Sequence, residues 1–203
     1  LLVPRAIAEV NLLPVPRGLV PDVAALVEPL ACCLRGVERA GVDAGDRVAI
    51  VGAGPIGLML AACVADAGGR PEVVGGRVER RALVPDFGGE TGAGEGADVV
   101  IEAAGTEEAW QRALELVRPG GTVAVVGLYA ENMVFAPTLA VRRELSLLFS
   151  YSCNYADYET ALDLLGSGAI DPGPLLSRYP LVDAPEAFEA VGEGRAVKAL
   201  LVP

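Results

Sequence analysis

Three glycines at a fixed spacing give the strongest chemical signal in this sequence, in the segment Gly52-Ala53-Gly54-Pro55-Ile56-Gly57. The segment lies between a short apolar run and a helix-length apolar stretch, so each glycine has a definable role. Gly52 would permit a tight turn, Gly54 would let a pyrophosphate approach the backbone, and Gly57 would let helix and strand pack closely. The start of the helix, at Pro55 and Ile56, would add partial positive charge beside the phosphates. The motif predicts dinucleotide binding; the alternative is a tight strand-to-helix turn without a ligand.

The residues after the second predicted strand indicate which dinucleotide would bind. An acidic residue is expected there, about 20 positions after the glycine motif, to accept hydrogen bonds from the adenosine ribose. This sequence has Gly75 at that point, followed by Gly76 and Arg77. Glycine leaves room for a 2′-phosphate, which Arg77 with Arg80 or Arg81 could bind in a fork. We therefore predict a preference for NADP over NAD; the alternative is that these arginines only decorate a solvated helix.

The ends of three further predicted strands are also candidates for contact with a cofactor. Ligands of open α/β sheets bind at the carboxyl edge of the strands. Each end taken alone is ordinary loop sequence, but together they outline a groove. The candidate cofactor-binding residues at these ends are Ala104, Gly105, Val126, Gly127, Leu128, Phe149 and Ser150.

The composition excludes several other kinds of site. The 203 residues contain no histidine, which removes Ser-His-Asp catalysis, Cys-His catalysis and every metal site that needs imidazole. The four cysteines show no Cys-x-x-Cys spacing, so we predict buried thiols in a reducing compartment and no metal ligands. A net charge of −11 without a basic cluster argues against a nucleic-acid or anionic-membrane surface. The sequence has no apolar run of about 18 residues and no signal-peptide layout, so we expect a soluble, cytoplasmic protein.

Short apolar strands alternate with helices along the middle of the chain. Near-continuous apolar strands are typical of a parallel sheet that helices cover on both faces, so we predict an α/β, doubly wound Rossmann sheet. The predicted strands are residues 47–51, 72–74, 98–102, 122–126 and 145–150. The predicted helices are residues 55–67, residues 107–117 with Thr106 as the cap, and one that Asn154 caps.

The two ends of the chain have a different pattern. Residues 1–20 are extended and punctuated by prolines, which predicts a strand and a linker. Asp22 is expected to cap a short helix, and Pro29 to open another that ends at about Ala40. After Gly168 we expect proline-rich turns, a short helix near residues 185–191 and a last strand at 197–202 that need not join the same sheet.

With these motifs in place, the sequence resembles the zinc-dependent medium-chain alcohol and polyol dehydrogenases, the group of the sorbitol and threonine dehydrogenases. The resemblance covers nearly the whole chain, and the ordered set is more specific than the glycine motif alone. The segments that match the family are Ala25–Ala31, Gly45–Gly57, Ala97–Gly105, Leu116–Gly121 and Ala184–Phe188.

The resemblance implies a division of the chain. Residues 1–20 would end the first segment of a chaperonin-10-like catalytic domain, residues 21–168 would form the dinucleotide-binding domain, and residues 169–203 would return to the catalytic domain. The Cys and Gly-His-Glu zinc motif and the structural zinc lobe of the family have no counterpart here, so zinc would bind only if a missing N-terminal part were supplied. The chain opens with Leu1 in place of Met, which agrees with such an upstream part.

Two further expectations follow from the resemblance. Glu28 matches the glutamate beside the catalytic zinc and its water in polyol dehydrogenases; the alternative is a carboxylate that only stabilises the start of a helix. The family usually has a helix, a strand and a helix after the second strand, whereas residues 82–96 here are glycine-rich, with Ala82–Val84 as the remaining strand. We therefore expect an eroded sheet edge and a weakened adenine site.

The leading hypothesis is the cofactor-binding portion of an NAD(P)-dependent dehydrogenase that transfers hydride between a secondary alcohol or polyol and nicotinamide. The alternative is a non-catalytic NADP(H)-binding protein or a degenerate, truncated remnant. A methyltransferase also has a glycine loop, but it generally has an acidic residue at the end of the second strand, and Gly75 argues against that class. Family members usually form dimers or tetramers through the last strand of the nucleotide-binding sheet, and residues 145–150 are apolar enough for a homodimer or tetramer to be expected.

Overall fold

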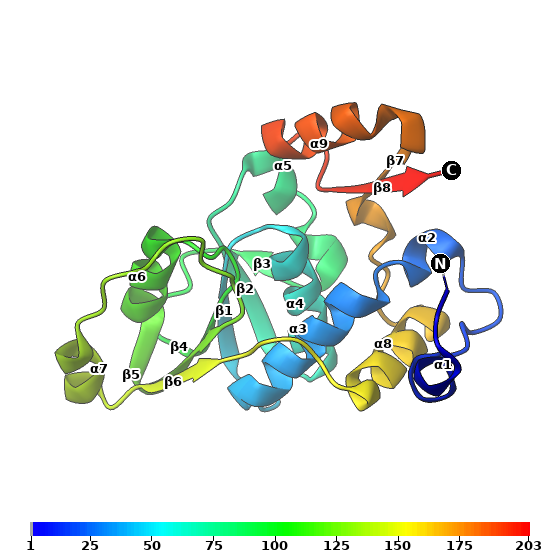
Figure 1. The fold of residues 1–203 in the computed structure, drawn as a ribbon. Coiled ribbons are helices and arrows are strands. Elements are labelled where there is room, and N and C mark those ends of the chain that lie inside the picture. The colour runs from blue at the N-terminus through cyan, green and yellow to red at the C-terminus, as the bar shows by residue number, and fades with distance from the viewer. Residues whose placement is uncertain (1) are drawn as a thin grey trace.

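A six-stranded parallel sheet forms the centre of the computed structural model, which describes residues 2–203 (Figure 1). Its order is β3-β2-β1-β4-β5-β6, with every neighbouring pair parallel. This order is that of a doubly wound Rossmann sheet, in which two halves meet between β1 and β4. The predicted fold class is confirmed. The strands are β1 (Arg47–Val51), β2 (Arg70–Val74), β3 (Glu90–Thr91), β4 (Ala97–Glu102), β5 (Val117–Val125) and β6 (Ser146–Phe149).

Helices cover both faces of this sheet. One face packs against α3 (Val27–Ala40) and α4 (Pro55–Asp66), with α8 (Tyr155–Ser167) behind α3, and α6 (Glu107–Leu116) covers the other (Figure 1). The side chains of the strands alternate between two separate apolar clusters, which contain Ile50 and Ile101 on one face and Val100 and Trp110 on the other. Both faces are therefore buried, which explains the consecutive apolar residues Val48–Val51 of β1 and Val99–Ile101 of β4.

Local signals set the starts of two helices as the sequence predicts. The Thr106 hydroxyl accepts a hydrogen bond from the Ala109 N–H at the start of α6. Asn154 and Asp157 form a reciprocal capping box at the start of α8. These caps fix where the chain leaves the carboxyl ends of β4 and β6.

The N-terminal expectations are partly wrong. The segment predicted as a strand and linker contains a helix, α1 (Arg5–Asn11), and Leu1 lies outside the described residues. Asp22 does not cap α2 (Pro21–Ala24), because Val20 takes the cap position and Pro21 the first helical position. Helix α3 begins at Val27, two residues before Pro29, because proline fits anywhere in the first turn, where its missing N–H needs no partner.

The shortened segment after β2 forms little regular structure. It contains α5 (Val78–Arg81), the 3-10 turn η1 (Val84–Phe87) and β3, which has only two residues. The strand predicted at Ala82–Val84 is wrong: Val84 is buried in the core as part of the 3-10 turn, and the edge strand forms later. The predicted erosion of this sheet edge is confirmed.

The C-terminal segment forms a separate two-stranded parallel sheet, as the sequence allows. Its elements are η2 (Gly173–Leu175), β7 (Leu176–Pro180), η3 (Leu181–Asp183), α9 (Ala184–Glu193) and β8 (Lys198–Val202). β7 and α7 (Pro137–Arg143) are elements that the sequence reading missed. None of the helices among residues 2–203 is long and apolar enough to cross a membrane.

Candidate functional site

The glycine loop between β1 and α4 has the geometry that its sequence predicts. Gly52 has a φ of +116°, which favours glycine, and its N–H donates to the Val74 carbonyl. A Cβ atom on Gly57 would lie 1.8 Å from the Gly52 carbonyl oxygen, so only glycine lets α4 pack this closely on the turn. A Cβ atom on Gly54 would meet nothing within 4 Å. The loop therefore packs tightly at its first and third glycines and leaves open space at the second, where Gly54 precedes Pro55, the first residue of α4.

The end of β2 is open where the sequence predicts room for a phosphate. Gly75 has a φ of +79° and no atom within 4 Å of a Cβ position. A Cβ on Gly76 would lie 2.5 Å from the Ala53 Cβ, so the two turns touch. The exposed Arg77 donates instead to the carbonyl oxygens of Gly192 and Glu193, in the last turn of α9. A 2′-phosphate at this point would therefore compete with α9 for the Arg77 guanidinium.

Arg80, the second predicted phosphate ligand, is half-buried in α5. Its Nε atom is buried and has no hydrogen-bond partner among the described residues. Arg80 therefore follows Gly75 by five residues and has at least one N–H group without a partner among the described residues.

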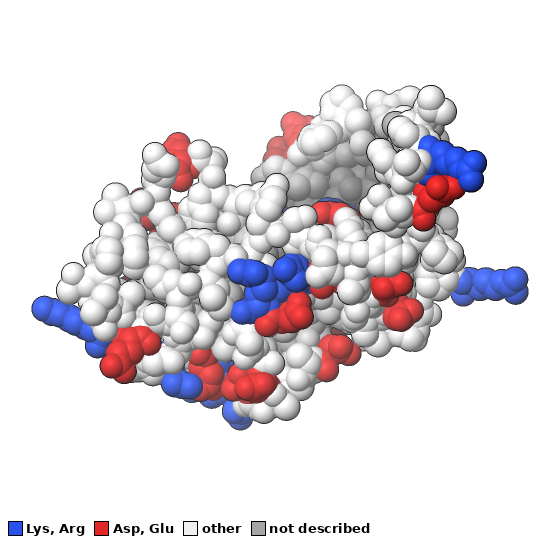
Figure 2. Space-filling view, turned by 60° about the horizontal axis from the view of Figure 1, so that its bottom comes forward, with Lys and Arg blue, Asp and Glu red and all other residues white. Residues whose placement is uncertain are grey.

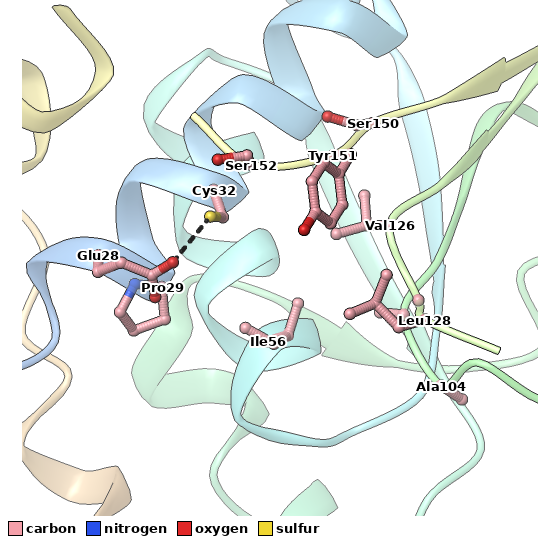
Figure 3. Close-up of a pocket in the computed structure, with 12 residues that line it drawn as sticks. Glu28, Pro29, Cys32, Ile56, Ala104, Val126, Leu128, Ser150, Tyr151 and Ser152 are labelled. Atoms are coloured by element: carbon pink, nitrogen blue, oxygen red, sulfur yellow. Dashed lines mark hydrogen bonds between the residues drawn. The ribbon is translucent and has the colours of Figure 1, made fainter. Parts of the chain in front are cut away.

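A cavity of about 440 Å³ lies at the carboxyl ends of β4, β5 and β6 (Figure 3). It brings together seven of the predicted site residues, which are Glu28, Ile56, Ala104, Val126, Gly127, Leu128 and Ser150. The sequence reading did not single out the other lining residues, which are Pro29, Cys32, Ala103, Tyr151 and Ser152. Phe149, predicted for the same groove, is 58% exposed and does not line the cavity.

The polar groups of this cavity are few. Ser150 presents a buried Oγ atom that has no partner among residues 2–203. Tyr151 is 81% exposed, and its ring projects over the cavity (Figure 3). A mostly apolar cavity with a few unpaired polar atoms suits a planar, partly polar ligand.

Glu28 lies at the rim of this cavity, in the first turn of α3. The Cys32 thiol donates to its Oε1 atom over 3.5 Å (Figure 3). Burial, the neighbouring Cys153 and the Glu28 carboxylate raise the pKa of Cys32 to about 12, so this thiol stays protonated. The described residues contain no group of three His, Cys, Asp or Glu side chains that could hold a metal ion. A zinc site has four ligands or three with a water, so the residues around Glu28 do not fit zinc.

Glu102, at the end of β4, is a residue that the sequence reading missed. Its side chain is fully buried, and its Oε1 atom accepts hydrogen bonds from the backbone N–H groups of Ala104 (2.6 Å) and Gly105 (2.8 Å). A Cβ atom on Gly127 would lie 2.4 Å from its Oε2 atom. The only available signal was an acidic residue directly after the apolar run Val99–Ile101 of β4.

A second cavity, of about 340 Å³, lies between the start of α4 and the C-terminal segment. Pro55 lines one side, and Phe188, Val191 and Lys198 line the other. Lys198 is the one lysine of the chain, and the sequence reading did not select it. Lys198 therefore lines the same cavity as Pro55, the residue that begins α4. On the face drawn in Figure 2, basic and acidic side chains lie next to one another in several small groups.

Comparison with known proteins agrees with this geometry. The sequence profile described as zinc-binding dehydrogenase matches residues 55–167. Sorbitol dehydrogenase of Halalkalibacterium halodurans is 30% identical over 208 residues, which cover 93% of this chain and 61% of the relative. The solved structure of a zinc-binding dehydrogenase from Sinorhizobium meliloti, bound to NADP, is 33% identical with a TM-score of 0.83 and covers 93% of this chain and 61% of that one.

A second solved structure, alcohol dehydrogenase from Thermus sp. ATN1, is 29% identical with a TM-score of 0.89. The match covers 97% of this chain and 62% of the Thermus chain. This chain therefore spans about 60% of the length of the relatives it matches.

Proposed function

Because this chain belongs to the zinc-binding dehydrogenase family, we propose that it is the cofactor-binding portion of an NAD(P)-dependent oxidoreductase that acts on a secondary alcohol or polyol. The proposal rests mainly on the glycine loop. A Cβ atom at Gly52 or Gly57 would meet neighbouring protein atoms, whereas one at Gly54 would meet none within 4 Å. Bound nicotinamide would supply the hydride chemistry, and the chain's own residues would bind and orient the dinucleotide.

The two halves of the sheet divide the dinucleotide between them. The pyrophosphate would lie over Gly54, where the N–H groups at the start of α4 and the charge of Lys198 both favour an anion. The adenosine ribose would lie at Gly75, because that is the end of β2. The nicotinamide would then enter the cavity at β4, β5 and β6, where the unpaired Ser150 Oγ can hydrogen-bond its carboxamide.

We assign a preference for NADP over NAD to the end of β2. Gly75 stands where a carboxylate would repel a 2′-phosphate, and no protein atom lies within 4 Å of its Cβ position. Arg80 has an uncommitted N–H group, and Arg77 is within the same turn. The NADP bound to the Sinorhizobium relative supports this assignment by similarity.

The division into domains is part of the proposal. Residues 21–168 would be the dinucleotide-binding domain, and residues 1–20 and 169–203 would belong to a catalytic domain. Since the described residues do not fit zinc, zinc binding would require ligands from elsewhere, with Glu28 next to them at the cavity rim.

Assembly of identical chains is a further part of the proposal. β6 is one of the two outermost strands of the sheet and pairs only with β5 among the described residues. Leu147 and Leu148 are half-buried and Phe149 is exposed, so this edge would pair with a second copy in a homodimer or tetramer.

Titration of the chain with NADPH, NADP⁺ and NADH by calorimetry tests the proposal. Gly54→Ala is the informative variant, because its methyl group would meet no protein atom and would occupy the space assigned to the pyrophosphate. We expect at least a tenfold loss of affinity, or about 1.4 kcal/mol, without loss of stability. Gly192→Ala is the matched control, since it is the other glycine of negative φ with an open Cβ position. Wild-type chain that binds no dinucleotide, or equal binding by both variants and the wild type, would overturn the proposal.

A further inference from the structure

Glu102 places a negative charge directly behind one wall of the cavity assigned to nicotinamide. Gly127 lines that cavity, and a Cβ atom on Gly127 would lie 2.4 Å from the Glu102 Oε2 atom. Ala104, which also lines the cavity, donates its N–H to the Oε1 atom of the same carboxylate. Two residues that line the cavity are therefore in direct contact with the carboxylate.

This carboxylate has no cation to balance it. None of the ion pairs among the described residues involves Glu102, and its Oε2 atom is buried without a hydrogen-bond partner there. The phenol of Tyr129 lies beside this carboxylate: burial raises the pKa of Tyr129, and the Glu102 carboxylate raises it further. A buried charge with no counter-ion acts over a longer range than an exposed one, because little water screens it.

The two oxidation states of nicotinamide differ in charge. The oxidised ring carries a positive charge and the reduced ring is neutral, while the phosphates and the adenosine are the same in both. A negative charge behind the ring therefore changes the affinity for one state relative to the other and leaves the shared contacts unaffected.

We propose that Glu102 makes this site discriminate between the two oxidation states, favouring the oxidised dinucleotide through a charge that no cation among the described residues balances. The inference rests on the proposed function, because it requires the nicotinamide in this cavity. Glu102 acts through the field at the ring and does not touch it, so its role differs from that of the cavity-lining residues.

A purely structural role predicts a different outcome for one conservative variant. Glu102→Gln retains the size of the side chain and an oxygen that can accept from Ala104 and Gly105, so it holds the loop and removes only the charge. If Glu102 only holds the loop, this variant should weaken or preserve the binding of both oxidation states equally.

The experiment measures the dissociation constants of NADP⁺ and NADPH for the wild type, Glu102→Gln and Asp98→Asn. Asp98 lies on the same strand at the opposite edge of the sheet, about 13 Å away along β4, and Arg118 neutralises it. We expect Glu102→Gln to shift the ratio of the two constants about tenfold against NADP⁺ and Asp98→Asn to leave the ratio unchanged. An unchanged ratio in Glu102→Gln, or an equal shift in Asp98→Asn, overturns the inference.

Tyr129→Phe provides a second test if Glu102→Gln does not fold. Removing the hydroxyl beside the carboxylate leaves its charge less compensated, so we expect the ratio to move about twofold toward NADP⁺. No change, or a change in the other direction, contradicts the inference. If neither form binds the wild-type chain, the proposed function fails as well; if both bind and the ratio is insensitive, only the role of Glu102 fails.

Discussion

The amino edge of the central sheet, where the strands begin, and its carboxyl edge, where they end, differ in how their polar groups are paired. At the amino edge, Arg118 binds Asp98, and Arg47 donates to the carbonyl oxygens of Glu95 and Gly96. At the carboxyl edge, polar atoms of Arg80, Glu102, Tyr129 and Ser150 are buried without a partner. These are four of the five buried unpaired side-chain atoms found among the described residues, and the fifth is in Trp110 on α6.

This difference separates stability from binding. A buried polar atom without a partner costs free energy, so a concentration of such atoms at one edge indicates a site that a ligand completes. At the amino edge the polar groups are paired, so they contribute to stability, and the described residues there have no buried unpaired polar atom for a ligand. Removing a polar side-chain group at the amino edge should therefore change stability, and removing an unpaired one at the carboxyl edge should change binding.

The largest expected effect comes from a glycine in the turn that shapes the carboxyl edge. Gly105 (φ +70°) and Gly75 (φ +79°) have similar backbones, but a Cβ on Gly105 would lie 2.3 Å from the Leu128 carbonyl oxygen, whereas one on Gly75 meets nothing. We expect Gly105→Ala to lower the free energy of unfolding by about 3 kcal/mol or more and Gly75→Ala by about 1 kcal/mol. Urea denaturation of both variants checks this, and equal losses would show that the contact with Leu128 is unimportant.

The next effect concerns the phosphate end of the carboxyl edge. Arg77→Gln should weaken NADPH binding about tenfold and leave NADH binding unchanged, because only NADPH carries the 2′-phosphate. The matched control is Arg142→Gln, an exposed arginine in α7 that is not among the predicted phosphate ligands. If both dinucleotides lose affinity equally, the role of Arg77 is to hold α9 through Gly192 and Glu193.

Much of the fold could be predicted from the sequence, whereas the unpaired atoms could not. Apolar runs and caps such as Thr106 and Asn154 act over a few residues, so their elements are predictable from local sequence. The burial of Glu102 depends on Gly105 and Gly127, which come from two different strand ends. The pairing of Arg77 with α9 joins residues 115 and 116 positions apart. Such long-range contacts leave no local pattern, and the strand misplaced at Ala82–Val84 has the same cause, because tertiary burial of Val84 overrides its strand preference.

Substitution of Ser150, at the carboxyl edge, should change binding and stability differently. Its Oγ atom is buried and unpaired, so Ser150→Ala should leave the free energy of unfolding unchanged or slightly higher. The same variant should weaken dinucleotide binding about fivefold, because it removes the hydrogen bond proposed for the carboxamide. Calorimetric binding and urea denaturation together check this prediction. A loss of stability without a loss of affinity would mean that the hydroxyl has a partner within the fold.

Asp98 gives the smallest expected effect, and it should appear in stability alone. The Arg118 guanidinium and then the Arg47 backbone N–H lower the pKa of Asp98 in the folded chain. Its contribution is therefore fully present above the ordinary carboxyl pKa of about 4 and is lost as the pH falls through the lower folded-state value. Because both partners of the ion pair are partly exposed, we expect only about 0.5 kcal/mol. Urea denaturation of the wild type and Asp98→Asn should give that difference at pH 7 and a vanishing one in acid. A difference that persists at low pH would mean that the shape of the side chain, and not its charge, stabilises the amino edge.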